Sequence, residues 1–175
     1  LKGDILMTAS RYAEAAMAYA EELRTVTTAD LVMRSVAALN AAGRPDESVK
    51  LLTEWLEKQP DDQAARMTLI GLDLAAKRYD AAEAQLNTLV EKQPGNVMAL
   101  NNLAWVYHQK NDPRARALAQ RAYLLGPTAP VSDTFGWILT SHGEAALALA
   151  VTVRAARSMP VTSPSWTRAL RCFFR

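Results

Sequence analysis

The chain has 175 residues, with 20 Lys and Arg against 18 Asp and Glu, and a net charge of +2 at pH 7. Half of the residues are hydrophobic, which is enough to bury a continuous core, and the mixture of both charges argues against a dedicated nucleic-acid-binding protein. No stretch approaches the ~20 apolar residues of a membrane-spanning helix, and the single cysteine, Cys172, excludes an internal disulfide.

Proline returns along the chain at a nearly constant interval. The repeated positions are Pro60, Pro94, Pro127 and Pro160, which lie 34, 33 and 33 residues apart. A second series, made of small residues, keeps the same interval at Ala15, Ser48, Ala82, Ala115 and Ala148. Two series that stay in phase along the whole chain indicate a repeat array.

Each interval predicts two helices joined by a short turn, because apolar residues recur at helical spacing and are interrupted halfway. In chain order the predicted pairs are 1–9 with 12–26, 29–42 with 45–58, 63–77 with 79–92, 97–110 with 113–125, and 131–142 with 144–159. All eight prolines fall at the edges of these helices, where a missing N–H is tolerated. The small residues lie on the second helices, which can therefore approach their neighbours closely.

The first three pairs depart in places from this pattern. Leu1 opens in mid-helix with Gly3 already at a small position, so we expect the chain to be a fragment of a longer array. Val36 and Ile70 stand where a small residue is expected on the first helix, and we expect these two pairs to be slightly splayed. The acidic pair Asp61-Asp62 marks the start of the helix that follows it, where negative charge complements the helix dipole.

The fourth and fifth pairs carry the clearest motif. Their first helices contain a large apolar residue followed by a small one, at Leu103-Ala104 and Phe135-Gly136, and then Tyr107 or Leu139 on the same face. A unit of this length and pattern resembles the tetratricopeptide repeat (TPR) family. The resemblance implies an all-α, right-handed solenoid with repeats at about 1–27, 28–60, 61–94, 95–127 and 128–160.

The last residues differ in composition from the repeats. Residues 145–175 contain five Arg and no acid, so they carry +5 while the remainder carries −3. We predict a capping helix at 163–174 within a tail of residues 161–175, started by Ser163-Pro164 and buried through Trp166, Leu170 and Phe173 or Phe174. A nucleic-acid or membrane contact, or a reading frame foreign to the repeats, would also explain a basic tail.

Residues that could support catalysis are few. His108 and His142 have no His, Cys, Asp or Glu at the spacing of a helical metal site. Ser141 adjoins His142 in sequence, which is not how a nucleophile meets its base, and we expect His142 to cap carbonyls in an inter-helix turn. There is no Gly-rich phosphate loop. We therefore predict a protein that is not an enzyme and needs no metal or cofactor.

The TPR resemblance implies that first helices line a concave groove. The residues opposite the packing positions are the candidate ligand-binding residues, namely Asn101, Asn102, Trp105, His108 and Gln109 on the fourth repeat and Asp133, Trp137 and Thr140 on the fifth. Two tryptophans beside amides suit an extended peptide or partner protein, and they suit a sugar chain as the alternative ligand. A third reading is that both tryptophans are packed in the core.

Other residues bear on the extent of this groove. Met33 and Met67 would extend it with adaptable apolar surface or pack in the core, and Trp55, on a second helix, is expected to be structural. Some TPR proteins hold a carboxylate tail with Asn, Lys and Arg. Asn102 could match one clamp residue, but Pro130 and Thr134 stand where cations would be needed, so this mode is disfavoured.

A narrower resemblance covers residues 98–143. The segments ALNNLAWVY, DPRARALAQRAYLLGP and DTFGWIL resemble the last repeats of the TPR lipoproteins that accompany bacterial PEP-CTERM and exosortase systems. This resemblance implies a role in exopolysaccharide production or protein sorting, and a lipid-anchored parent in the periplasm or outer envelope. The chain departs from these proteins after about Ala150.

Self-association through the open ends of the array is also possible for such a solenoid.

Overall fold

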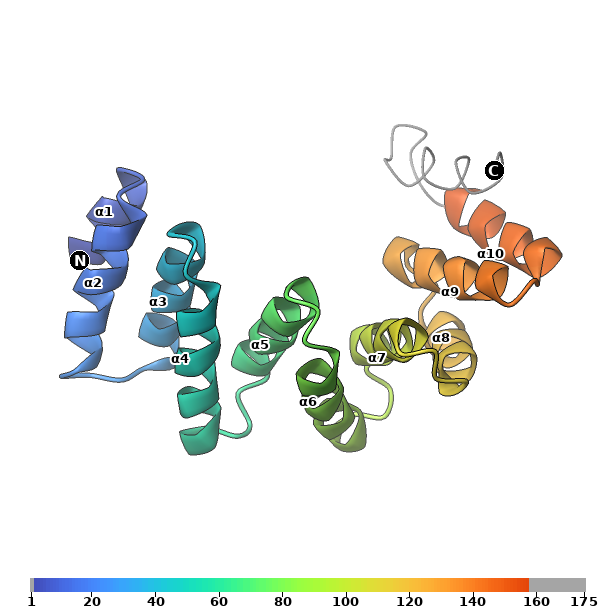
Figure 1. Cartoon of the computed structure of the whole chain (residues 1–175), viewed down its shortest axis with the longest axis horizontal. Coiled ribbons are helices and arrows are strands. Elements are labelled where there is room, and N and C mark those ends of the chain that lie inside the picture. The colour runs from blue at the N-terminus through green and yellow to red at the C-terminus, as the bar shows by residue number, and fades with distance from the viewer. Residues whose placement is uncertain (1, 158–175) are drawn as a thin grey trace. The chain divides into compact units, whose positions relative to one another are not determined.

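The computed structural model describes residues 2–157, and every regular element within them is an α-helix (Figure 1). The helices are α1 Lys2–Thr8, α2 Tyr12–Leu23, α3 Ala29–Ala41, α4 Pro45–Lys58, α5 Gln63–Ala75, α6 Tyr79–Lys92, α7 Val97–Gln109, α8 Arg114–Leu125, α9 Ala129–Ser141 and α10 Ala145–Arg157. The predicted all-α fold is confirmed, and the helices agree with the predicted ranges to within a few residues. The predicted helix at 163–174 and the tail at 161–175 lie outside the described residues.

The chain divides into two compact units, Leu1–Arg78 and Tyr79–Arg175. In the first unit α1 packs on α2, α2 on α3, α3 on α4 and α4 on α5. In the second, consecutive helices from α6 to α10 pack in the same way, and α7 also contacts α9. Packing between helices that follow one another in sequence is the organisation expected of a repeat array. No helix within residues 2–157 is long and apolar enough to cross a membrane.

The core is a series of layers, each shared by neighbouring helices. One layer joins Leu6, Tyr19 and Leu31 from α1, α2 and α3, and the next joins α3, α4 and α5 through Val36, Leu52 and Leu69 among others. In the second unit Leu100, Ala122 and Val131 join α7, α8 and α9. Met33 is partly buried against the second of these layers, as the core reading of this residue predicted.

The small residues of the repeat mark the tightest contacts. Ala15, Ser48, Ala82, Ala115 and Ala148 are all between 0% and 4% exposed, which confirms their packing role. On the first helices, a Cβ added to Gly3 would collide with the Tyr19 ring, and one added to Gly136 would lie 2.8 Å from Thr152 Cγ2. Val36 and Ile70, the larger residues at this position, are buried as well, and the splaying of their helix pairs stays a prediction.

The five turns that join the two helices of a pair all have the same backbone conformation. A residue with positive φ, between 56° and 77°, ends each first helix: Ser10, Gly43, Lys77, Asn111 and Gly143. The next residue donates its N–H to the carbonyl five residues earlier, at 2.8 to 2.9 Å, from Arg11 to Leu6 through Glu144 to Leu139. This is the Schellman motif, which satisfies carbonyls that a helix end leaves unpaired. The positions are those at which the sequence predicted the turns.

The start of α5 explains the role of Trp55. Asp62 caps the helix, because its Oδ1 accepts the Ala65 N–H at 3.0 Å, and its Oδ2 accepts the Trp55 indole N–H at 2.8 Å. Both hydrogen bonds favour the ionised carboxylate and hold the pKa of Asp62 below its usual range. The predictions of a helix start at this acidic pair and of a structural Trp55 are therefore confirmed.

Candidate functional site

The candidate residues on α7 and α9 differ in how far they are accessible. Trp105, His108 and Gln109 are half-buried, as are Asn102 and Asp133, whereas Thr140 is exposed. Trp137 is 49% exposed, which is unusual for so large an apolar side chain. These residues lie on the two first helices that contact each other in the second unit.

Asn101 departs from the prediction, which turned it towards the groove. Its side chain is buried, with 5% exposure, and its Oδ1 has no hydrogen-bond partner within the described residues. The physical reason is that α7 is packed by α6, α8 and α9 and therefore buries a wide face. Asn101 belongs to that face, so the accessible strip of α7 consists of Asn102, Trp105, His108 and Gln109.

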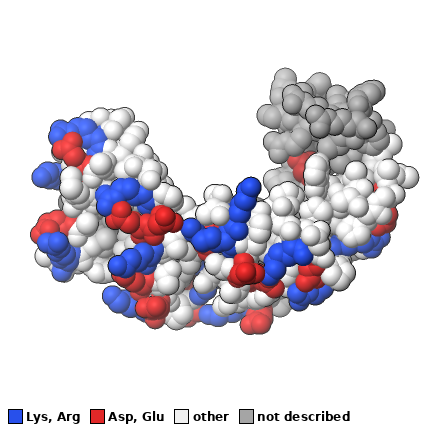
Figure 2. Space-filling model, in the orientation of Figure 1, with Lys and Arg blue, Asp and Glu red and all other residues white. Residues whose placement is uncertain are grey.

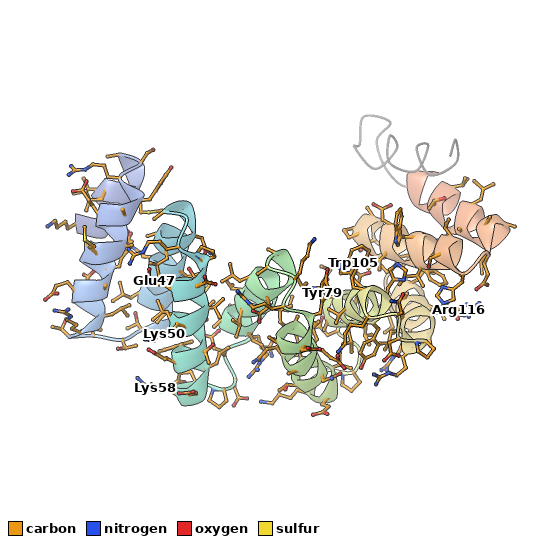
Figure 3. The ribbon with its side chains drawn as sticks, in the orientation of Figure 1. Glu47, Lys50, Lys58, Tyr79, Trp105 and Arg116 are labelled. Carbon is orange, nitrogen blue, oxygen red and sulfur yellow. The ribbon has the colours of Figure 1, made fainter. Side chains whose placement is uncertain are left out.

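Trp105, His108 and Trp137 form one aromatic cluster across the two repeats, and we call it the Trp-His cluster. The indole Nε1 of Trp137 donates a hydrogen bond to Nε2 of His108 at 3.1 Å. The rings of Trp105 and His108 lie 6.0 Å apart between centroids, tilted by 45°. Figure 3 labels Trp105, the member of the cluster that comes first in sequence. The cluster therefore links α7 to α9 while half of the Trp137 surface stays open.

The hydrogen bond defines the protonation state of His108. An indole N–H can only donate, so Nε2 of His108 must be the unprotonated nitrogen of a neutral imidazole. Burial and, as the smaller effect, the coulombic influence of His142 both lower the pKa of His108 from its ordinary value. The ring is thus held neutral by its surroundings and by the geometry of its contact with Trp137.

The position occupied by the two tryptophans does not require a large side chain. It directly follows the small residue of the first helix, and in α3 and α5 the equivalent residues are Ala37 and Gly71, both exposed. A Cβ added to Gly71 would meet no atom within 4 Å. The fold therefore places no demand for a large side chain at this position, yet it carries tryptophan in both of the last two repeats.

The surface around the Trp-His cluster is almost free of formal charge. Helices α7 and α9 contain no Lys or Arg, and Asp133 is their one acidic residue. In Figure 2 the surface over α9 is mostly white, whereas both charges are mixed over α4. At the positions of the carboxylate clamp, α9 carries Pro130 and Thr134, and the Thr134 hydroxyl donates to the Pro130 carbonyl at 3.0 Å. This surface therefore suits an uncharged or weakly basic ligand.

Ion pairs brace the helices that carry the cluster. Lys110, after α7, donates to Asp80 at 2.7 Å and to Glu83 at 2.6 Å, and these contacts raise the pKa of its amine. Arg116 on α8 makes two hydrogen bonds to Glu144, the residue that precedes α10, at 2.7 and 2.8 Å. Each contact therefore joins one repeat to the next beside the α7–α9 surface.

The turn after α7 is fixed by a further charged group. The Arg114 guanidinium lies 4.1 Å from the centre of the Tyr107 ring and donates to Asp112 at 2.6 Å. The hydrogen bonds from Arg114 lower the pKa of Asp112 to about 2. This arrangement combines a cation–π contact with a charge-assisted hydrogen bond.

Ser141 and His142 do not form a catalytic pair. The Ser141 hydroxyl donates to the Ile138 carbonyl at 2.7 Å, and Nδ1 of His142 lies 2.8 Å from the same oxygen. Since a carbonyl only accepts, Nδ1 must carry a proton. Both side chains therefore cap the end of α9, which confirms the predicted role of His142. Among residues 2–157, no three His, Cys, Asp or Glu side chains are grouped as metal ligands.

The hydrogen bond between His108 and Trp137 was not predicted from the sequence. The pattern placed both residues on the groove, and it recognised Trp105 and Trp137 as equivalent positions. It did not show that Trp137 reaches back to the preceding repeat. One signal in the sequence could have indicated the contact. His108 lies one helical turn after Trp105 on the same face of the helix, and Trp137 is the equivalent of Trp105 in the next repeat.

Comparison with known proteins agrees with this architecture. A family model described as a tetratricopeptide repeat matches residues 39–104. The TPR repeat-containing protein PA4667 of Pseudomonas aeruginosa is 29% identical over 150 residues, which is 82% of this chain. The chain spans 25% of the length of that curated relative.

Solved structures show the same fold. TTC0263, a thermophilic TPR protein of Thermus thermophilus, superposes with a TM-score of 0.75 at 16% identity, over 99% of this chain and 96% of that one. MamA from Desulfovibrio magneticus gives a TM-score of 0.75 at 16% identity and covers 89% of each chain. The fold is that of a TPR solenoid, and none of these similarities points to an enzyme family.

Proposed function

We propose that this TPR solenoid is a non-catalytic scaffold that binds an extended segment of a partner protein along α7 and α9. The Trp-His cluster and its polar neighbours Asn102, Gln109 and Thr140 form the contact surface. TPR proteins bind protein partners, and the proposal adds which surface of this chain does so and what chemistry it offers.

One observation carries the proposal. The position after the small residue holds Ala37 and Gly71 in two repeats, and it holds Trp105 and Trp137 in the next two. Because the smaller residues satisfy the fold, the tryptophans are not needed for packing. The half-buried indole of Trp105 and the exposed indole of Trp137 offer large, rigid contact area at low entropic cost, which is typical of binding surfaces.

The chemistry of the surface limits the ligand. With no cation on α7 or α9, an acidic tail or a phosphorylated peptide would find no counter-charge. An extended peptide would place apolar side chains on the indoles and its backbone amides against Asn102 and Gln109. A neutral polysaccharide is the second candidate, because sugar C–H faces stack on indoles while hydroxyls bond to the same amides.

We further propose that the parent protein works at the bacterial envelope, in the periplasm or associated with the outer membrane. The motifs of residues 98–143 support this proposal through their resemblance to TPR lipoproteins of PEP-CTERM systems, where protein sorting and exopolysaccharide production are linked. Fractionation of cells that produce the tagged full-length protein tests it. Recovery of the protein in the cytoplasmic fraction would contradict the envelope assignment.

The binding proposal is tested by selection against this surface. A random peptide library displayed on phage is panned on the wild-type chain, and in parallel an oligosaccharide array is probed with the same protein. Both assays are repeated with Trp105→Ala/Trp137→Ala. Trp55→Phe is the matched control, because it removes an indole that serves the start of α5.

Peptides that bind the wild type and Trp55→Phe but not the double variant would support a peptide scaffold. The same pattern on the array would favour the glycan-binding alternative. Circular dichroism must show that the double variant keeps its helicity. Ligands that bind the double variant as well as the wild type would place the site elsewhere and refute the assignment.

A further inference from the structure

We infer that His108 is a pH-dependent latch for Trp137, which holds the indole in place when neutral and releases it when protonated, so that ligand binding at this surface weakens on acidification. The inference rests on the proposed binding function of the Trp-His cluster. It adds regulation of that site by pH.

The latch follows from hydrogen-bond chemistry. Nε2 of the neutral ring accepts the Trp137 N–H at 3.1 Å. Protonation places a hydrogen on Nε2, so that two donors face each other and the hydrogen bond is lost. Trp137 is 49% exposed and lies at a position that the fold does not require it to fill. Once the hydrogen bond is broken, the indole is therefore free to adopt other rotamers.

The charged side chains on the helices around His108 are already paired, so we assign the response of this contact to acidification to His108. Burial of the ring and the coulombic effect of His142, in the turn after α9, both disfavour the charged form of His108. On α6, Asp80 and Glu83 are engaged by Lys110, and at α8 Arg116 is engaged by Glu144. Arg114 donates a hydrogen bond to Asp112. Asp133 on α9 is also engaged in an interaction.

The hydrogen bond between His108 and Trp137 should respond to acidification and not to alkalinisation. Since the pKa of His108 lies below the ordinary value of about 6.5, the latch is closed at neutral pH. It opens only in mildly acidic solution, below that value. A histidine that titrates in this range is the usual basis of a physiological pH switch.

Release should weaken binding for two reasons. An indole that is already held in one rotamer loses no further rotamer freedom when a ligand binds, whereas a mobile indole does. A positive charge also appears on an otherwise uncharged surface. A neutral peptide should therefore bind about two- to tenfold more weakly at about pH 5 than at about pH 7.5, the range expected for loss of one hydrogen bond.

The first test needs no ligand. The indole N–H resonance of Trp137, assigned with Trp137→Phe, is followed by NMR from about pH 7.5 to about pH 5. In the wild type it should shift together with the ring protons of His108. In His108→Gln the amide oxygen can still accept the indole N–H, and the shift should disappear. His142→Gln is the control, in which the titration of His108 should persist with a higher midpoint because the coulombic effect of His142 is removed.

The second test uses phage-displayed peptides selected on the wild type near neutral pH. Acidification should weaken their binding to the wild type, whereas the affinity of His108→Gln, whatever its value near neutral pH, should not change with pH. If no peptide is ever selected, the binding proposal fails, and the NMR titration still decides whether the latch exists. A Trp137 resonance that ignores His108 would overturn the latch. A resonance that titrates while peptides remain bound to the wild type would overturn its coupling to binding.

Discussion

Gly136, the small residue that precedes Trp137, allows a direct test of how closely α9 approaches α10. A Cβ at this position would lie 2.8 Å from Thr152 Cγ2, nearer than two carbon atoms can come. Thr152 cannot easily move away, because it is β-branched and its hydroxyl donates to the Ala148 carbonyl at 3.0 Å. We therefore expect Gly136→Ala to be opposed by this one methyl group.

The magnitude comes from two opposing effects. Replacing a glycine inside a helix by alanine stabilises it by about 1 kcal/mol. Forcing a methyl group into a filled contact costs about 1–3 kcal/mol. In the wild-type background Gly136→Ala should therefore lower the free energy of unfolding by up to about 2 kcal/mol. In a Thr152→Ser background, which removes Cγ2 and keeps the hydroxyl, the same change should be stabilising by about 1 kcal/mol.

The assay is a double-mutant cycle of Gly136→Ala and Thr152→Ser, with urea unfolding followed by circular dichroism. The reversal of sign between the two backgrounds is the expected result. A coupling energy below about 0.5 kcal/mol would mean that the two sites act independently. That result would refute the claim that Gly136 is required by the contact with Thr152.

Three further results follow from the packing, the backbone and the ionisable groups. Gly71→Ala and Gly43→Ala should change the free energy of unfolding in urea in opposite directions, although neither new Cβ meets an atom within 4 Å. Gly71→Ala, inside a helix, should stabilise the protein by about 1 kcal/mol. Gly43→Ala, at a position of positive φ, should destabilise it by about 1–2 kcal/mol. Arg78→Met should destabilise by about 3 kcal/mol in the same assay, because the buried Asp73 carboxylate loses the guanidinium that donates to it at 2.8 Å, whereas the Asp73→Asn/Arg78→Met double variant should recover part of the loss. Burial and the hydrogen bond to Asp4 raise the pKa of Tyr19 to about 12, so its contribution to stability should be complete below pH 10 and lost as the pH rises to about 12, and the difference in absorbance titration between wild type and Tyr19→Phe should show ionisation only at the upper end of that range.

The helices and turns could be predicted from the sequence because several independent signals mark the helix boundaries in each repeat. The prolines, the small residues and the short gaps between the two predicted helices of each pair all agree. The structure has a positive φ at Gly43, Lys77 and Asn111, in or beside these gaps. Lys77 and Asn111 show why the repeat mattered. Lysine alone would not indicate a left-handed turn, and asparagine is found there only some of the time, but their place in the period indicates one in both cases.

The candidate site could be predicted only in part, because exposure depends on which neighbours cover a helix. The periodicity put Asn101 and Trp105 on the same face of α7, one turn apart, but the structure buries the first and leaves the second accessible. The contact between Trp137 and His108 depends on the rotamers of two side chains 29 residues apart. Local patterns describe the backbone that carries these side chains and do not fix where the side chains meet.

The contact between His108 and Trp137 also bears on whether the tryptophans serve the fold or a ligand. A structural tryptophan in this protein looks like Trp55, which donates its N–H to the carboxylate that caps the next helix. Trp137 instead donates to a side chain on the same exposed surface, and nearly half of it remains open. The hydrogen bond holds the edge of the indole and leaves surface of the ring available. A ring fixed in this way has already lost its rotamer freedom before a ligand arrives, so less of the contact energy is spent on ordering it. The hydrogen bond also joins α7 to α9, but the solenoid does not require it, because Ala37 and Gly71 suffice at the same position in other repeats. A fixed and open indole is what the proposed binding surface needs.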